Sequence, residues 1–244
     1  MAETAAARPA KPGPFTPLIS ILSGLIVATF MAIVLGCAIH WAGLAWFWPQ
    51  EGAGRARSLL EADLAALKPF TRSALPGVRD PLLLAQSSAL LVSEYSGMTR
   101  VLGAVAAAPQ AAEQAQGKGP LSVSFKGLLA GMGPALAATY YLLQDIAVRL
   151  VIAFLALPVL GVALCVTFTD GLARRDVRRW CGGRESSFIY HNSKRYLWPL
   201  STLAFTVYLA WPLPGLAPVT AVLIGYVLMA CVIGLMAAKF KKYL

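Results

Sequence analysis

Long apolar runs dominate the pattern of hydrophobic and polar positions along the chain. A helix needs about 20 mainly apolar residues to cross a bilayer, and the uncharged stretch that begins at Leu18 exceeds this length. Three further apolar runs follow in the second half of the chain. The pattern therefore predicts four transmembrane helices, over residues 18–40, 148–168, 197–213 and 219–238, of which the second is uncharged from Leu150 onward.

The one large stretch between predicted spans covers residues 41–147, and its pattern predicts helices. Leucines at helical spacing predict a helix over residues 54–68. Asp80, followed by Pro81, predicts the start of a second helix that runs to about Ala107, because Asp is a good N-cap and Pro fits the first turn. No strand-like alternation persists, so we predict an all-α fold.

Residues 127–143 are uncharged but interrupted by glycines and a proline. Too few residues separate this stretch from the next span to form a comfortable loop between two crossing helices. We therefore predict a membrane-surface or re-entrant segment that continues into a helix.

Small residues recur at every fourth position of the first predicted span. On a helix they share one face, which would let another helix approach closely. Apolar helices are rich in Gly and Ala in any case, so ordinary composition explains the pattern equally well. The predicted packing residues are Ser20, Gly24, Ala28, Ala32 and Gly36.

Composition and charge agree with a membrane protein and orient it. Hydrophobic residues make up 58% of the chain and charged residues 13%, whereas soluble domains carry roughly 25% charged residues. The net charge of +10 is concentrated beside the apolar runs. Basic residues in the N-terminal stretch 1–17, the loop 169–196 and the tail 239–244 predict that these lie in the cytoplasm and that residues 41–147 lie outside.

The loop between the second and third spans is the most basic part of the chain. Residues 170–195 hold seven of the 21 Lys and Arg residues. If the second span continues as a helix into the cytoplasm, Asp170 and Arg174 are four residues apart and can pair. Arg175 and Arg179 have the same spacing but repel each other, while Asp176 would point elsewhere.

This basic helix should end at the Gly-Gly pair, and a second helix should follow it. Gly182 and Gly183 accept the left-handed conformation found at helix ends. Ser186 or Ser187 can cap a helix that leads into the third span. We predict a cytoplasmic helical hairpin, which could bind lipid headgroups, dock an acidic protein partner or, least favoured, contact nucleic acid directly.

The hairpin carries a motif, RRDxRRWxGGRESSFxYHxxKR, between two spans of a four-span chain. This arrangement resembles the integrating conjugative element membrane proteins of Gram-negative bacteria, a family of unknown biochemical function. The resemblance implies a multi-pass protein of the bacterial inner membrane with a part in conjugative DNA transfer, near the coupling ATPase and a type IV secretion channel. The motif residues are Arg174, Arg175, Asp176, Arg178, Arg179, Gly182, Gly183, Arg184, Glu185, Ser186, Tyr190 and His191.

We therefore expect a non-enzymatic subunit of a conjugative transfer apparatus that docks a cytoplasmic or coupling protein through the basic loop and contacts anionic lipid headgroups. No metal-ligand spacing or catalytic pair occurs, so we expect no cofactor. The alternative is a transporter or channel component. Against it, none of the apolar runs contains an Asp, Glu, Lys or Arg, although ion pathways usually place ionisable groups there. The oligomeric state is left open.

Overall fold

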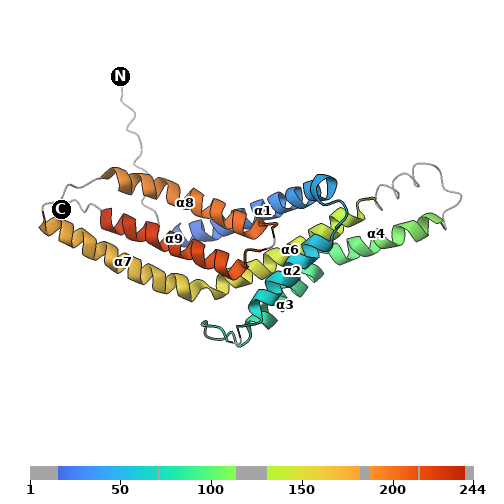
Figure 1. Cartoon of the computed structure of the whole chain (residues 1–244), viewed down its shortest axis with the longest axis horizontal. Coiled ribbons are helices and arrows are strands. Elements are labelled where there is room, and N and C mark those ends of the chain that lie inside the picture. Colours follow the sequence, from blue (N-terminus) through green and yellow to red (C-terminus); the bar gives the residue numbers. More distant parts are fainter. Residues whose placement is uncertain (1–15, 71, 114–130, 182–186, 214, 240–244) are drawn as a thin grey trace, which may run out of the picture.

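The computed structural model describes residues 16–70, 72–113, 131–181, 187–213 and 215–239, with the side chains of 16–18, 108–113 and 187–194 left out. Within these ranges all regular structure is helical, as predicted, and the molecule is elongated (Figure 1). The first half contains α1 (Thr16–Ala42), the π-helical turn η1 (Gly43–Phe47), α2 (Gly54–Leu67), α3 (Pro81–Tyr95) and α4 (Met98–Glu113). The second half contains α6 (Gly133–Leu155), α7 (Leu157–Trp180), α8 (Ser187–Ala210) and α9 (Pro218–Lys239).

Local sequence signals explain where several helices begin and end. The predicted helix over residues 54–68 is α2. The Asp80 carboxylate accepts hydrogen bonds from the backbone N–H groups of Leu82 and Leu83, at 2.9 and 3.2 Å, so the predicted N-cap of α3 is confirmed. The predicted continuous helix to Ala107 is wrong, because Gly97, with φ of 68°, separates α3 from α4.

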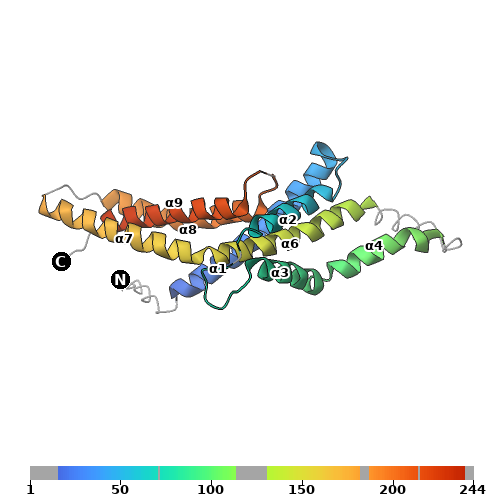
Figure 2. The ribbon, with the colours of Figure 1, turned by 60° about the horizontal axis from the view of Figure 1, so that its bottom comes forward.

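Helices α6 and α7 follow each other end to end and form a bent rod (Figures 1 and 2). Ala156 separates them, and Pro158 lies in the first turn of α7, where proline is tolerated. The chain bends at this junction, as expected near Pro158, but the bend lies between two helices and not within one (Figures 1 and 2). The residues predicted as one span, 148–168, are shared between two helices. The predicted segment 127–143 is described only from residue 131, and from Gly133 it is part of α6.

Four helices of the described chain are long and apolar enough to cross a membrane, the number predicted. They are Ile19–Phe47, which includes η1, together with α6, α7 and α9. The set differs from the predicted one: α6 is among the four, whereas the predicted span 197–213, which lies mainly in α8, is not.

Two packed groups hold the molecule together. Helices α7 and α9 lie side by side (Figures 1 and 2), and α2 and α3 rest on α6. One buried cluster joins α2 and α3 to the end of α6 and the start of α9, through side chains that include Leu60, Ala85, Val148 and Val222. A second joins α1, α6 and α8 around Ala32, Leu142, Ile146 and Leu209.

The contact between α7 and α9 depends on two glycines. A Cβ atom on Gly171 would overlap the carbonyl oxygen of Gly234. A Cβ atom on Gly234 would lie 2.6 Å from the carbonyl oxygen of Thr167. Backbone therefore meets backbone here, at a distance that only glycine allows.

Large apolar side chains cover the outside of the long helices. Phe30 on α1, Val162 on α7 and Leu228 on α9 are 63%, 66% and 61% exposed. So many exposed large apolar side chains are unusual on soluble proteins. It is consistent with contact between these helices and lipid.

Candidate functional site

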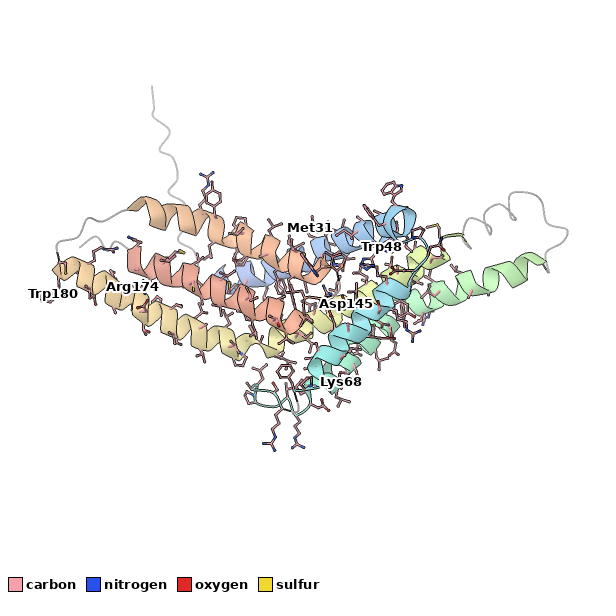
Figure 3. All side chains as sticks on the ribbon, in the orientation of Figure 1. Met31, Trp48, Lys68, Asp145, Arg174 and Trp180 are labelled. Atoms are coloured by element: carbon pink, nitrogen blue, oxygen red, sulfur yellow. The ribbon has the colours of Figure 1, made fainter. Side chains whose placement is uncertain are left out.

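The basic end of α7 lies at one extremity of the molecule, with Arg174 and Trp180 near its tip (Figure 3). The predicted ion pair is present, with Arg174 Nε 2.8 Å from Asp170 Oδ2. Trp180 is 90% exposed, and Arg179 is also exposed. The last turns of α7 thus present cationic and aromatic surface to solvent.

The other two arginines of this helix end are more constrained. Arg175 is largely buried, and its Nε lies 3.7 Å from Asp176 Oδ1, so the expectation that Asp176 would point elsewhere is wrong. Arg178 donates a hydrogen bond to the carbonyl oxygen of Ala238 and so ties α7 to the end of α9. Arg178 therefore has a structural contact that Arg174 and Arg179 do not share.

The remaining motif positions cannot be placed as side chains. Tyr190 and His191 belong to the first turns of α8, but their side chains are outside the described residues. The same holds for the whole stretch between α7 and α8, which contains Gly182, Gly183, Arg184, Glu185 and Ser186.

Four of the five small residues predicted for helix packing lie at contacts of α1. Gly24 faces the Trp198 ring of α8, and Gly36 faces Leu142 of α6. Ala28 and Ala32 are fully buried. Ser20, in contrast, is exposed. The small-residue face thus lets α1 approach two helices in succession.

A buried arginine cluster at the centre of the molecule was missed by sequence reasoning. Its core is Arg149 on α6, whose side chain is only 4% exposed. Arg149 Nε lies 2.7 Å from Asp63 Oδ2 on α2 and 3.0 Å from Asp145 Oδ2 on α6 itself. Asp145 is labelled where α2 and α6 meet in Figure 3.

The same guanidinium caps the C-terminal end of α8. Arg149 Nη1 donates to the carbonyl oxygens of Tyr208, Leu209 and Trp211, at 3.0, 3.4 and 2.9 Å. The last carbonyls of a helix have no partner within it and carry partial negative charge, which a cation satisfies. The Tyr208 hydroxyl in turn donates to the Arg149 carbonyl oxygen at 3.1 Å. We call Asp63, Asp145, Arg149 and these three carbonyl groups the Arg149 cluster; it joins α2, α6 and α8.

The Arg149 cluster puts ionisable groups on a helix that is a candidate span, whereas the predicted apolar runs contain none. The predicted second span, 148–168, was treated as uncharged from Leu150 onward, and Asp63 and Asp145 were assigned to the segment outside. In the structure α6 is one of the candidate spans and buries both Asp145 and Arg149. One local signal was readable: Asp63 lies between Leu60 and Leu67, on the leucine face of α2.

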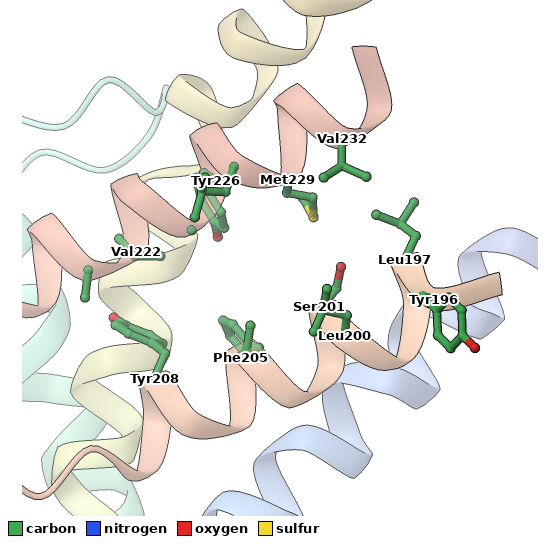
Figure 4. A pocket seen from close by; sticks show the side chains of 14 residues that line it. Tyr196, Leu197, Leu200, Ser201, Phe205, Tyr208, Val222, Tyr226, Met229 and Val232 are labelled. Carbon is green, nitrogen blue, oxygen red and sulfur yellow. The ribbon is translucent and has the colours of Figure 1, made fainter. Parts of the chain in front are cut away.

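A mainly apolar groove of about 530 Å³ separates α8 from α9 (Figure 4). Phe205, Leu200 and Met229 are among the side chains that line it. The Tyr226 hydroxyl at its wall already donates to the Ala153 carbonyl oxygen, at 2.8 Å. Among the residues that the structure describes, no group of three or more His, Cys, Asp or Glu side chains could hold a metal ion.

A protein-family model matches most of the chain. Residues 47–241 match the model of a family described as IncC plasmid conjugative DNA transfer protein DtrJ-like. The chain belongs to the DtrJ-like family. The match includes both the basic end of α7 and the Arg149 cluster, and leaves out all of α1.

Membership of the DtrJ-like family confirms the expected association with conjugative DNA transfer. The family is described from IncC plasmids, so the narrower resemblance to proteins of integrating conjugative elements is not what the match supports. No curated protein and no solved structure matches this DtrJ-like chain.

Proposed function

We propose that this DtrJ-like chain is a non-enzymatic inner-membrane subunit of a conjugative DNA transfer apparatus. In this proposal the basic end of α7 docks a cytoplasmic partner, and the leading candidate is the coupling ATPase of the apparatus. The main support is the exposed cationic and aromatic end of a lipid-facing helix in a chain of a conjugative transfer family.

The proposed placement in the membrane is supported by the apolar surfaces that the protein itself leaves uncovered. In the most apolar stretch of α6, 56% of the residues are buried within the molecule, whereas in that of α7 only 6% are buried. Since α6 and α7 are joined end to end, they extend in one general direction and together make one crossing. We place the bilayer around α7, α8, α9 and the first part of α1. The Arg149 cluster then lies near the outer boundary, and α2 and α3 lie outside.

The end of α7 is suited to an acidic protein surface. Arg and Trp are enriched among the residues that dominate binding energy at interfaces, and Arg179 and Trp180 are both exposed. Opposite charges also accelerate encounter, an effect that salt weakens. Anionic lipid headgroups could occupy the same arginines, at about 1 kcal/mol for each residue near the surface.

A transporter or channel component remains the second candidate, since α6 carries buried ionisable residues. Charged residues inside candidate spans often mark ion pathways. In this chain, however, Arg149 is hydrogen-bonded to Asp63 and to three backbone carbonyl groups and is ion-paired with Asp145, which favours a structural role. Ion flux in liposomes that contain the purified protein would distinguish the two functions, and ion-selective flux would favour transport.

A variant with Ala at Arg174, Arg175, Arg178 and Arg179 should capture much less coupling ATPase from detergent extracts and should support a lower transfer frequency. The reason is that the substitutions remove four positive charges from the end of α7. The control variant carries Ala at Arg57, Arg72, Arg79 and Arg100, which are exposed on the stretch from α2 to α4. It loses the same amount of positive charge but keeps the end of α7 intact. Capture and transfer that stay unchanged in the first variant would contradict docking. A version that keeps Arg178 separates loss of docking from loss of its bond to Ala238.

Reporter fusions should place the two large loops on opposite sides of the membrane. A fusion after Lys118 is expected to give periplasmic activity, and one after Gly183 cytoplasmic activity, because basic loops stay on the cytoplasmic side. Alkaline phosphatase and green fluorescent protein report the two sides. Activity on the same side for both positions would overturn the proposed placement.

A further inference from the structure

Two buried carboxyl groups converge on a single N–H group in the Arg149 cluster. Asp63 Oδ2 and Asp145 Oδ2 lie 2.7 and 3.0 Å from Arg149 Nε, with side chains only 6% and 5% exposed. The Nη1 group of Arg149 is directed at backbone carbonyls instead. One positive charge thus faces two carboxyl groups in a water-poor environment.

One carboxyl oxygen in this arrangement has no partner. Asp145 Oδ1 is buried and accepts no hydrogen bond. An ionised oxygen in this position would incur the full cost of desolvation. Two neighbouring carboxylates also oppose each other's ionisation, so a pair of this kind usually retains a proton.

We propose that Asp63 and Asp145 form a proton-binding site that holds one proton near neutral pH. The proton makes the total charge of the two aspartates and Arg149 zero. It also turns one carboxyl into a donor, and the two carboxyls lie against the same Arg149 Nε group. The pair, rather than either residue alone, is the binding unit.

A proton fits this site better than a metal cation. Sodium or a divalent ion would need several oxygen ligands. The backbone carbonyls at the end of α8 that could complete such a shell already accept hydrogen bonds from Arg149. A proton requires only the two carboxyl groups.

The neighbouring titratable groups come from each helix that surrounds the pair. His40 on α1 is buried, with Nδ1 donating to the Gly36 carbonyl oxygen at 2.9 Å. On α8 and α9, the hydroxyls of Tyr208 and Tyr226 are already donors to backbone.

Helix α3 also packs on α6, but it turns Ser93 inward, while Glu94 is exposed. The Asp63–Asp145 pair is therefore the acidic centre of this junction, and α3 adds no carboxylate to it.

The bound proton should make the stability of the protein depend on pH. The unfolded chain has both aspartates ionised at neutral pH, so folding takes up one proton. Stability is then greatest at mildly acidic pH and falls as the pH rises and the proton is lost. Two ionised carboxylates would give the opposite sign, with stability lost on acidification.

Infrared difference spectroscopy and thermal unfolding of the full chain in detergent test the site. At neutral pH we expect a C=O band from a protonated carboxyl group that shifts in heavy water. We also expect the melting temperature to fall by about 3 °C per pH unit above the pH of maximum stability. Asp145→Asn should abolish the band and flatten this pH dependence. Asp170→Asn, which alters an exposed Asp–Arg pair of the same spacing, should leave both unchanged.

Absence of the band from the wild-type protein would overturn the proposal, even if the Asp145→Asn variant failed to fold. A wild-type melting temperature that rises with pH would also overturn it. Stabilisation at alkaline pH by sodium chloride but not by choline chloride would assign the site to sodium instead of a proton.

Discussion

Replacing Arg149 by methionine is expected to lower the free energy of unfolding by about 3–5 kcal/mol, because removal of one partner from a buried ion pair leaves an uncompensated charge. The loss includes the carbonyl groups at the end of α8, which would also lose their donor. Arg149→Lys keeps the charge, but an ammonium group lacks the planar guanidinium that reaches the carboxylates and the α8 carbonyls together. We therefore expect an intermediate loss of unfolding free energy. Unfolding followed by tryptophan fluorescence in detergent measures both variants.

The exposed pair at the end of α7 provides the matched control. Arg174 and Asp170 have the same spacing as Arg149 and Asp145, with nearly the same Nε to Oδ2 distance, but they are exposed. Arg174→Met should therefore cost only about 0–1 kcal/mol. A third variant with apolar residues at positions 63, 145 and 149 should recover much of the loss. If Arg149→Met and Arg174→Met lowered the free energy of unfolding equally, burial would not be the reason for the large effect expected at Arg149.

Leucine at Gly171 should separate α7 from α9 and destabilise the protein by about 1–3 kcal/mol or more, the range found for overpacked sites. The reason is that the neighbouring atom is the backbone oxygen of Gly234, which cannot move aside as a flexible side chain can. Spin labels at Val166 and Leu235, both exposed on these two helices, should report a longer distance in the variant.

Glycines of the same two helices with open space around them are the controls. A Cβ atom at Gly161 on α7 or at Gly225 on α9 would meet nothing within 4 Å. Leucine at either position should leave the label distance unchanged. If Gly161→Leu separated the helices as much as Gly171→Leu, close backbone contact would not be what holds them.

Features formed by residues close in sequence could be predicted. The Asp80 cap needs only the next three residues, and the Asp170–Arg174 pair needs one helical turn. The extent of α2 follows from its leucine spacing. In each of these cases the physical cause lies within four residues, so a single sequence contains all of it.

The Arg149 cluster could not be predicted in the same way. Its partners Asp63 and Tyr208 are 86 and 59 residues distant in sequence. Hydropathy also cannot distinguish an apolar face covered by lipid from one covered by protein. Helix α6 is apolar because α1, α2 and α3 pack against it, and this is why the second span was assigned across the junction with α7.

The residues of the Arg149 cluster are synthesised at widely separated times. A ribosome delivers Asp63 first, then Arg149, and only later the end of α8 at Trp211. Arg149 therefore lacks the carbonyl acceptors at the end of α8 until the third of these segments has been synthesised. The junction of α2 and α6 is therefore completed only when the C-terminal end of α8 has been synthesised and has packed against it.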